Sequence, residues 1–382
     1  MNNKQYNKSK NISLNEFIKN ERFHRIVYLK SVVYNELNNN RWDNIEYLLH
    51  LLYEQKLYGF IGYDNHVYTC IISILGNKKM IDKALYIFDE MKRNNIEPNI
   101  ITYNAMISVC EKISNIKMAL KLFNEMKINK IIPDVITYSI MISACAKIQN
   151  INNALKLFDE MKRNNIKPNV ITYSSMISVC TKTSNMDIAL KLFDEMNKNN
   201  IEPNIITYNA MISVCEKTKN IDKALKLFNE MKINNIKPDI ITYNAMISAC
   251  EKTQNIDKAL ELFDELKINN IKQTIITYSN LLNIYIIKDD KNEYNNMMDT
   301  IVKITKINIK DEKIDLHGYN WGIGIMLVKN GHKYNKTLTL MTGIGKHSYK
   351  KYSVIHDKII EYLNKMNIQY IDNKYEVVIN YD

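Results

Sequence analysis

A 35-residue segment recurs along most of this chain and constrains its fold more than any other feature. The copy at residues 205–239 reads IITYNAMISVCEKTKNIDKALKLFNEMKINNIKPD. Close copies fill residues 100–134, 135–169, 170–204 and 240–274, and a less similar one fills residues 65–99. Tandem self-similarity at such a period is typical of solenoids, in which every unit packs only against its neighbours.

Each copy predicts two helices. The first, in residues 205–239, carries an i, i+3, i+4, i+7 apolar face made of Tyr208, Met211, Ile212 and Cys215. The second carries its own face, made of Ile221, Ala224, Leu225, Phe228 and Met231. Asn220 is a suitable N-cap for the second helix, and Pro238 ends the unit. Since neither helix can bury its apolar face alone, the fold class is an α-solenoid of helical hairpins.

Two polar positions change from copy to copy while the apolar framework stays constant. One is the residue that follows the Tyr found at the same place in every copy, and it is Thr69, Asn104, Ser139, Ser174, Asn209 or Asn244. The other is the residue that ends the unit, and it is Asn99, Asp134, Asn169, Asn204, Asp239 or Thr274. We expect the first position to lie off the apolar face, where packing does not dictate it. Such residues cap helices and close turns. Their coordinated variation on a fixed scaffold instead favours a ligand-reading role.

A lysine recurs near the end of each first helix. These residues are Lys112, Lys147, Lys182, Lys217 and Lys252. A single lysine there could be a solvated side chain or a partner of the helix dipole. Five in register predict a row of positive charge that could follow a phosphate backbone.

These features resemble the pentatricopeptide repeat (PPR) family, strongly over residues 65–274 and weakly over about 29–309. The tetratricopeptide family shares the Ala-x-x-x-Phe and Pro positions, here Ala224, Phe228 and Pro238. It differs in its period of about 34 residues and in its Trp-containing first helix. The present chain has a period of 35 residues and the sequence ITYN-x-MIS in that place.

The resemblance implies binding of single-stranded RNA at one base per repeat, in RNA processing, stability or translation. It assigns base selection to the two variable polar positions and base packing to Ile101, Ile136, Ile171, Ile206, Ile241 and, more weakly, Ile276. In that family the residues at the two variable positions of a repeat together select one base. Applied to the six pairs in chain order, this rule gives A, U, A, A, U and then a pyrimidine. The predicted core site is therefore 5′-AUAAU(C/U)-3′. His66 departs from the aliphatic rule in the first copy.

The formal net charge of +11 suits a polyanionic partner, and its diffuse distribution suits a groove rather than a basic tail. Five of the six cysteines occupy one core position of successive repeats, too far apart for disulfides, so we expect small buried hydrophobes and no metal ligands. No apolar run reaches membrane-spanning length, and we expect a monomer. The family implies a mitochondrial or plastid location. A cytoplasmic one stays open, because no targeting segment is clear.

We divide the chain into five segments. Residues 1–28 form a tail and a capping helix, residues 29–64 a degenerate repeat, residues 65–274 six repeats, residues 275–309 another degenerate repeat, and residues 310–382 a small α/β domain. Strands are expected at 310–316, 337–341, 370–371 and 375–379, with a helix at 354–366.

The last segment carries Asp-Leu-His-Gly at 315–318 and Thr-Gly-Ile-Gly-Lys-His-Ser at 342–348. Together they resemble the small MutS-related (Smr) domain, whose members bind nucleic acid and in some cases cut it. The resemblance implies that Gly343, Gly345 and Lys346 hold a phosphate. If the domain is an endoribonuclease, Asp315, His317 and His347 are the catalytic candidates, and Mg²⁺ is a candidate cofactor. Binding without cleavage stays open.

Two other functions remain as alternatives. A helical scaffold of the tetratricopeptide type would bind protein, and would be indifferent to changes at the polar positions. A DNA-directed Smr endonuclease would prefer the matching DNA strand to RNA.

Overall fold

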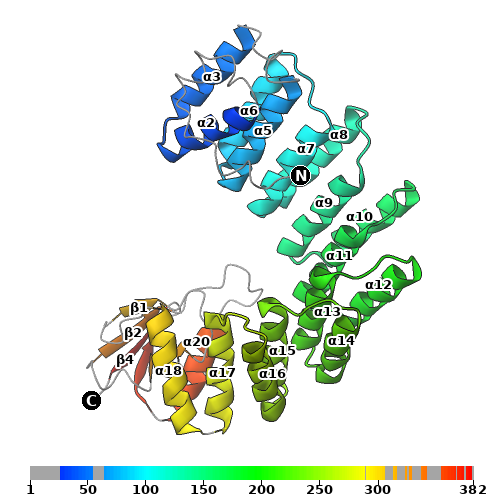
Figure 1. The fold of residues 1–382 in the computed structure, drawn as a ribbon. Helices are drawn as coiled ribbons and strands as arrows, with labels where there is room; N and C mark the ends of the chain where they lie inside the picture. The colour runs from blue at the N-terminus through cyan, green and yellow to red at the C-terminus, as the bar shows by residue number, and fades with distance from the viewer. Residues whose placement is uncertain are drawn as a thin grey trace. The chain divides into compact units, whose positions relative to one another are not determined.

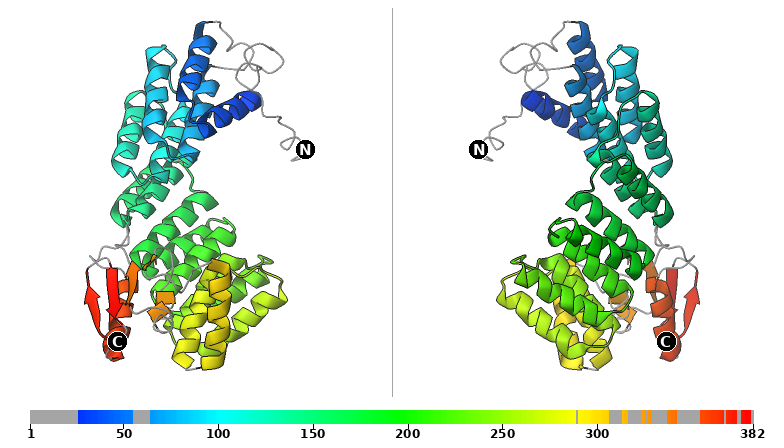
Figure 2. Two further views of the ribbon diagram at one scale, coloured as in Figure 1. Left: turned by 90° about the vertical axis from the view of Figure 1, so that its left-hand side faces the viewer. Right: turned by 90° about the vertical axis from the view of Figure 1, so that its right-hand side faces the viewer.

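The computed structural model describes residues 26–54, 64–288, 290–305, 313–315, 323–324, 327–328, 337–341, 354–366, 368–373 and 376–380. It divides into two compact units, residues 1–183 and 184–382. Antiparallel helical hairpins stack side by side within each unit, as Figures 1 and 2 show. The solenoid expected from the repeat is confirmed over the described hairpins.

Nine helices form the described part of the first unit. They are α2 (Ile26–Asn38), α3 (Trp42–Glu54), α5 (Asp64–Asn77), α6 (Ile81–Arg93), α7 (Ile100–Lys112), α8 (Ile116–Ile128), α9 (Val135–Lys147), α10 (Ile151–Arg163) and α11 (Val170–Thr183). The first helices of successive repeats contact one another: α5 packs on α7, α7 on α9 and α9 on α11.

The repeat helices of the second unit continue the pattern. They are α12 (Met186–Lys198), α13 (Ile205–Lys217), α14 (Ile221–Ile233), α15 (Ile240–Lys252), α16 (Ile256–Ile268), α17 (Ile275–Lys288) and α18 (Lys291–Thr305). Here α13 packs on α15 and α15 on α17. The weak repeats at both ends of the array also form hairpins, α2 with α3 and α17 with α18.

The core consists of the same side chains in every repeat. Tyr103, Met106, Ile107 and Cys110 of α7 are buried, as are the equivalent residues of α9, α11, α13 and α15. The second helices α8, α10, α12, α14 and α16 each bury an Ala, a Leu, a Phe and a Met or Leu, and α6 buries the same set with Ile87 in place of the Leu. Phe123 meets Tyr138 of the next repeat edge to face at 5.6 Å, and Phe228 meets Tyr243 in the same way. Each repeat therefore completes the core of its neighbour.

The Tyr hydroxyl groups are held in a polar network that links repeats. Tyr103 donates to Glu125 Oε1 at 2.9 Å and accepts from Asn129 Nδ2 at 2.9 Å. Lys92 of the preceding repeat pairs with Glu125 at 2.5 Å and lies over the ring of Phe88. Tyr243, Glu265, Asn269 and Lys232 repeat the arrangement in the second unit. The network satisfies the one polar atom of a buried aromatic side chain.

All six cysteines are free and buried, as expected for small core residues. Burial raises the pKa of the Cys110 and Cys145 thiols to about 11 and that of Cys180 to about 12. Such thiols carry almost no thiolate near neutral pH and are inert as nucleophiles or ligands. Within the helices that the structure describes, none is long and apolar enough to cross a bilayer.

A four-stranded sheet follows the solenoid in the order β1-β2-β4-β3 (coloured orange to red in Figure 2). Strand β1 (Lys313–Asp315) is parallel to β2 (Thr337–Met341), while β4 (Glu376–Asn380) is antiparallel to both β2 and β3 (Tyr370–Asp372). Helix α20 (Val354–Lys365) lies close to the expected range. Between β1 and β2, residues 323–324 and 327–328 are helical, and the rest of the connection lies outside the described residues.

Candidate nucleic-acid interface

The residue after each Tyr is buried, which corrects the expectation that it lies off the packed face. Exposure is 9% for Asn104, Asn209 and Asn244 and 5% for Ser139 and Ser174. Thr69 is 8% exposed. The reason is that successive first helices pack against each other, so a residue off the intrahelical apolar face still meets the next repeat. Only one edge of each side chain reaches the surface.

In the units that end in Asn or Asp, the last residue caps the first helix of the next repeat. Asp134 Oδ1 accepts from the backbone N–H of Thr137 at 2.8 Å, and Asp239 Oδ1 accepts from that of Thr242 at 2.9 Å. Asn99 Oδ1 accepts from the N–H groups of Ile101 and Thr102. The capping interpretation of this position is therefore correct.

Capping uses only one of the two terminal atoms of each side chain. The remaining atom of Asp134 and Asp239 is the acceptor Oδ2, whereas that of Asn99 and Asn169 is the donor Nδ2. No described residue makes a hydrogen bond to any of these four atoms. Asn and Asp thus cap equally well while offering a ligand opposite hydrogen-bonding groups.

The two variable positions lie next to each other. Asn104 Nδ2 donates to Asp134 Oδ1 at 3.3 Å, and Asn209 Nδ2 donates to Asp239 Oδ1 at 3.2 Å. Asn244 Nδ2 donates to Thr274 Oγ1 at 3.2 Å. Each Asn/Asp pair presents one spare N–H beside one carboxylate oxygen, the complement of a base edge that offers an acceptor next to a donor.

A row of exposed isoleucines stands beside these pairs. The exposed fractions of Ile101, Ile136, Ile171, Ile206, Ile241 and Ile276 lie between 54% and 60%. An apolar side chain that recurs exposed at the same position of every repeat is unusual for packing and suits contact with a flat apolar partner. The residue at this position in the first strong repeat, His66, is also exposed.

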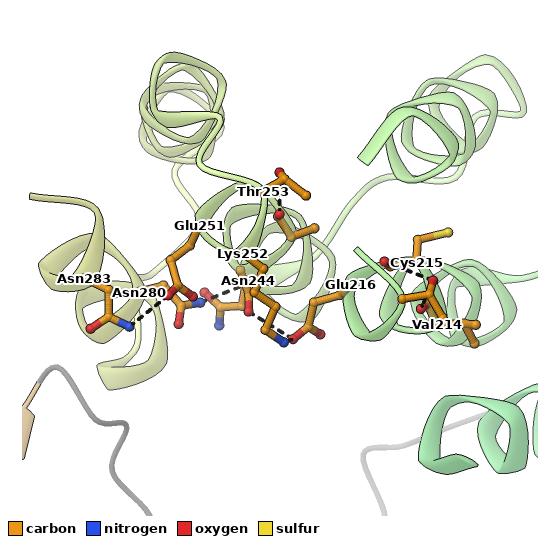
Figure 3. A network of polar contacts seen from close by, with 12 residues as sticks. Val214, Cys215, Glu216, Asn244, Glu251, Lys252, Thr253, Asn280 and Asn283 are labelled. Atoms are coloured by element: carbon orange, nitrogen blue, oxygen red, sulfur yellow. Dashed lines mark hydrogen bonds and ion pairs between the residues drawn. The ribbon is translucent and has the colours of Figure 1, made fainter. Parts of the chain in front are cut away.

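The lysines end their helices as predicted, but they are not equivalent. Lys147 pairs with Glu111 at 2.9 Å and Lys252 pairs with Glu216, while Lys112 donates to Asn77 Oδ1 at 2.6 Å. Figure 3 shows the Lys252 ammonium directed at Glu216 of the preceding first helix. Lys182 and Lys217 are exposed and have no ion pair among the described residues. Sequence reasoning missed this difference, although Glu111 and Glu216 recur in register with their partners.

Most of the catalytic and phosphate-binding candidates of the C-terminal segment lie outside the residues that the structure describes. Asp315 ends strand β1, and only its backbone is described. His317, Gly343, Gly345, Lys346 and His347 lie outside the described residues. A contact that the sequence did not predict joins His356 Nε2 of α20 to Asp372 Oδ1 of β3 at 2.9 Å. It holds the helix to the sheet.

Two family models match the chain. The "Pentacotripeptide-repeat region of PRORP" matches residues 137–310, and the "PPR repeat family" matches residues 64–112 and 98–147. Both matches end at or before residue 310. No curated protein matches the chain.

Solved structures of repeat proteins are similar to this chain. The PPR10 protein from maize is 25% identical with a TM-score of 0.52, and the match covers 73% of this chain and 39% of PPR10. The same protein in complex with an 18-nt psaJ RNA element is matched at 22% identity and a TM-score of 0.42 over 77% of this chain and 46% of that one. The PPR domain of Arabidopsis thaliana PRORP1 in complex with tRNA is matched at 20% identity and a TM-score of 0.40, over 47% of this chain and 94% of that domain. The chain thus spans less than half of PPR10.

Proposed function

Since residues 64–310 are built from pentatricopeptide repeats, we propose that this chain binds single-stranded RNA and selects one base with each repeat. PPR10 has been solved in complex with RNA, and the PRORP1 repeats with tRNA. The observation that carries the proposal is the spare hydrogen-bonding atom beside each helix cap. It changes from acceptor to donor between Asp and Asn without any change in the fold.

The chemistry of the pairs supports the decoded site 5′-AUAAU(C/U)-3′. At Asn104/Asp134, the spare N–H suits a uracil carbonyl, and the spare carboxylate oxygen suits the uracil N3–H. At Thr69/Asn99 the spare group is the N–H₂ of Asn99, which suits a ring-nitrogen acceptor of adenine. The exposed isoleucine of each repeat provides an apolar contact for the face of the base.

In this proposal the lysines near the ends of the first helices contact the phosphates. Lys182 and Lys217 provide exposed ammonium groups, while Lys147 and Lys252 each share theirs with a glutamate of the preceding repeat. We therefore assign the strongest phosphate contacts to the first pair.

We also propose that residues 310–382 form an Smr-like domain that contacts the bound RNA. The mixed sheet and helix α20 support a small α/β fold. Its candidates are Asp315, His317 and His347 for proton transfer, with Gly343, Gly345 and Lys346 for the phosphate. Incubation of bound RNA with and without Mg²⁺, for wild type and His317→Ala, tests cleavage. Intact RNA under all conditions would leave a binding role only.

Direct binding measurements test the main proposal. A labelled RNA containing AUAAUU should bind more tightly than RNAs with a single replaced base, and more tightly than the same sequence as DNA. A preference for the DNA strand would favour a DNA-directed enzyme. Equal affinity for all RNAs would favour a protein-binding scaffold and contradict base selection.

A further inference from the structure

A threonine precedes the Tyr of six successive repeats and is fully buried, whereas the repeat at residues 65–99 has Val67 in this place. Thr102, Thr137, Thr172, Thr207, Thr242 and Thr277 all have an exposed fraction of 0%. Each belongs to the capping box or N-cap of its own helix, where its hydroxyl oxygen lies near the unit-ending residue. Asp134 N–H donates to Thr137 Oγ1 at 3.2 Å, and Asp239 N–H donates to Thr242 Oγ1 at 3.1 Å.

The same hydroxyl group reaches the preceding repeat. The single proton of the Thr137 hydroxyl has two acceptors within reach, Asn104 Oδ1 at 2.7 Å and Asp134 Oδ1 at 2.9 Å, and the bond to Asn104 is the shorter. Thr242 Oγ1 likewise lies 2.6 Å from Asn209 Oδ1 and 3.0 Å from Asp239 Oδ1. Thr277 makes the same bond to Asn244 at 2.7 Å. A short hydrogen bond from a buried donor holds the amide oxygen inward, so the amide nitrogen faces the unit-ending residue and the surface.

We propose that this threonine is a positioning residue for base selection, because it fixes which end of the preceding Asn amide faces the RNA. The inference rests on the proposed RNA-reading function and deepens it. Base choice then depends on three side chains: the Asn of one repeat, the unit-ending residue, and the Thr of the next repeat. Without the hydroxyl group the amide can rotate, and either its oxygen or its nitrogen can face the base.

Repeats that carry a hydroxyl at the first polar position provide a contrast. Thr69 contacts Thr102 at 2.8 Å, oxygen to oxygen, and Ser139 contacts Thr172 at 2.9 Å. In these pairs the same oxygen atom can donate or accept, so there is no orientation to fix. The positioning effect belongs to the Asn repeats alone.

The test compares Thr137→Val, which keeps the shape but removes the hydroxyl group, with Thr137→Ser, which keeps the hydroxyl group. Affinities of the full chain for two RNAs that differ only by U or C at the second base give a ratio independent of the folded fraction. We expect Thr137→Val to lower the U-over-C ratio about three- to tenfold, the effect of one hydrogen bond. Thr137→Ser should keep the ratio, and the fifth base should be unaffected.

Thr242→Val should give the reverse result, losing selectivity at the fifth base and keeping it at the second. If Thr137→Val does not fold, Thr242→Val provides the test in its place. Thr102→Val, facing a hydroxyl repeat, should leave selectivity at the first base unchanged. If Thr137→Val or Thr242→Val keeps the wild-type ratio at its own base, the threonine has only a structural role and the proposal is wrong, while RNA reading stands. Wild type without any preference at these bases would overturn the proposed function as well.

Discussion

The unit-ending side chains use their two terminal atoms differently. Asp134 caps a helix with Oδ1 and leaves Oδ2 for a ligand, while Asn99 caps with Oδ1 and leaves Nδ2. Capping and base reading are therefore compatible in one residue. This explains how the position can vary between Asn and Asp while the helices begin at the same place in each repeat.

The raised pKa values of buried thiol and phenol groups in the core predict a loss of stability in alkaline solution. Burial raises the pKa of Cys110 from 9.0 to about 11, and burial followed by the hydrogen bond to Glu125 raises that of Tyr103 from 10.0 to about 12. Each group binds its proton more tightly in the folded chain than in the unfolded one. Stability is therefore full below about pH 9 and falls as the pH rises toward 11 and 12.

Thermal unfolding followed by circular dichroism across this pH range measures the effect. A Cys110→Ala/Cys145→Ala variant should lose less of its Tm between pH 9 and 11, because two of the groups are absent. A Tm that stays constant up to pH 11 in the wild type would contradict the assignment.

Helix α2 and the helices from α5 to α16 are each followed, one or two residues after their last residue, by a residue in the left-handed region. Gln254 has a φ of 58° after α15, and Asn255 N–H returns to Cys250 O at 2.9 Å. This is the bond pattern of a helix C-terminus that glycine usually closes. Asparagine occupies many equivalent positions, and Lys, Gln or Ser occupies the others. The turns are thus a source of strain that a small change can relieve.

Gln254→Gly should raise the free energy of unfolding by about 1 kcal/mol, because glycine adopts a positive φ without the Cβ penalty. Gln273→Gly is the matched control. Gln273 precedes α17 and is not among the positive-φ residues. There the same substitution should only raise the conformational entropy of the unfolded chain, which lowers the stability of the fold. Chemical denaturation of both variants checks the signs. A loss of stability in both would show that Gln254 is not strained.

The two helices of each repeat followed from the sequence, but the surroundings of some residues did not. Helical periodicity and the Asn and Pro positions placed the hairpins, because these signals are local. The burial of Asn104 depends on contact with Thr137 of the next repeat, which no single-helix pattern contains. The pairing of Lys147 with Glu111 was missed for the same reason. Interactions between repeats require the geometry of the stack.

For the whole molecule, the 52 Lys and Arg residues overstate the number of cations available to RNA. Several of them are paired within the array, as Lys127 is with Glu160 and Lys232 with Glu265. Only exposed ammonium groups without a carboxylate partner can exchange counterions for phosphates at little cost. The salt dependence of binding should therefore be smaller than the number of lysines suggests.

Lys182→Ala and Lys217→Ala should each reduce the slope of log affinity against log salt by about 0.7, the value for one phosphate contact on a single strand. Lys147→Ala is the matched control and should change the slope less, because Glu111 already holds its ammonium group. Titrations at several salt concentrations give the slopes. Equal effects of all three substitutions would contradict the distinction between paired and exposed lysines.

Selection from a random RNA pool, with wild type and Asp134→Asn in parallel, tests the central claim most directly. The substitution keeps the capping oxygen and replaces the spare acceptor by a donor, which suits N3 of cytosine better than the N3–H of uracil. The account predicts AUAAU(C/U) for wild type, and a change from U toward C at the second base alone for the variant. No enriched sequence, or changes spread over several bases, would contradict it.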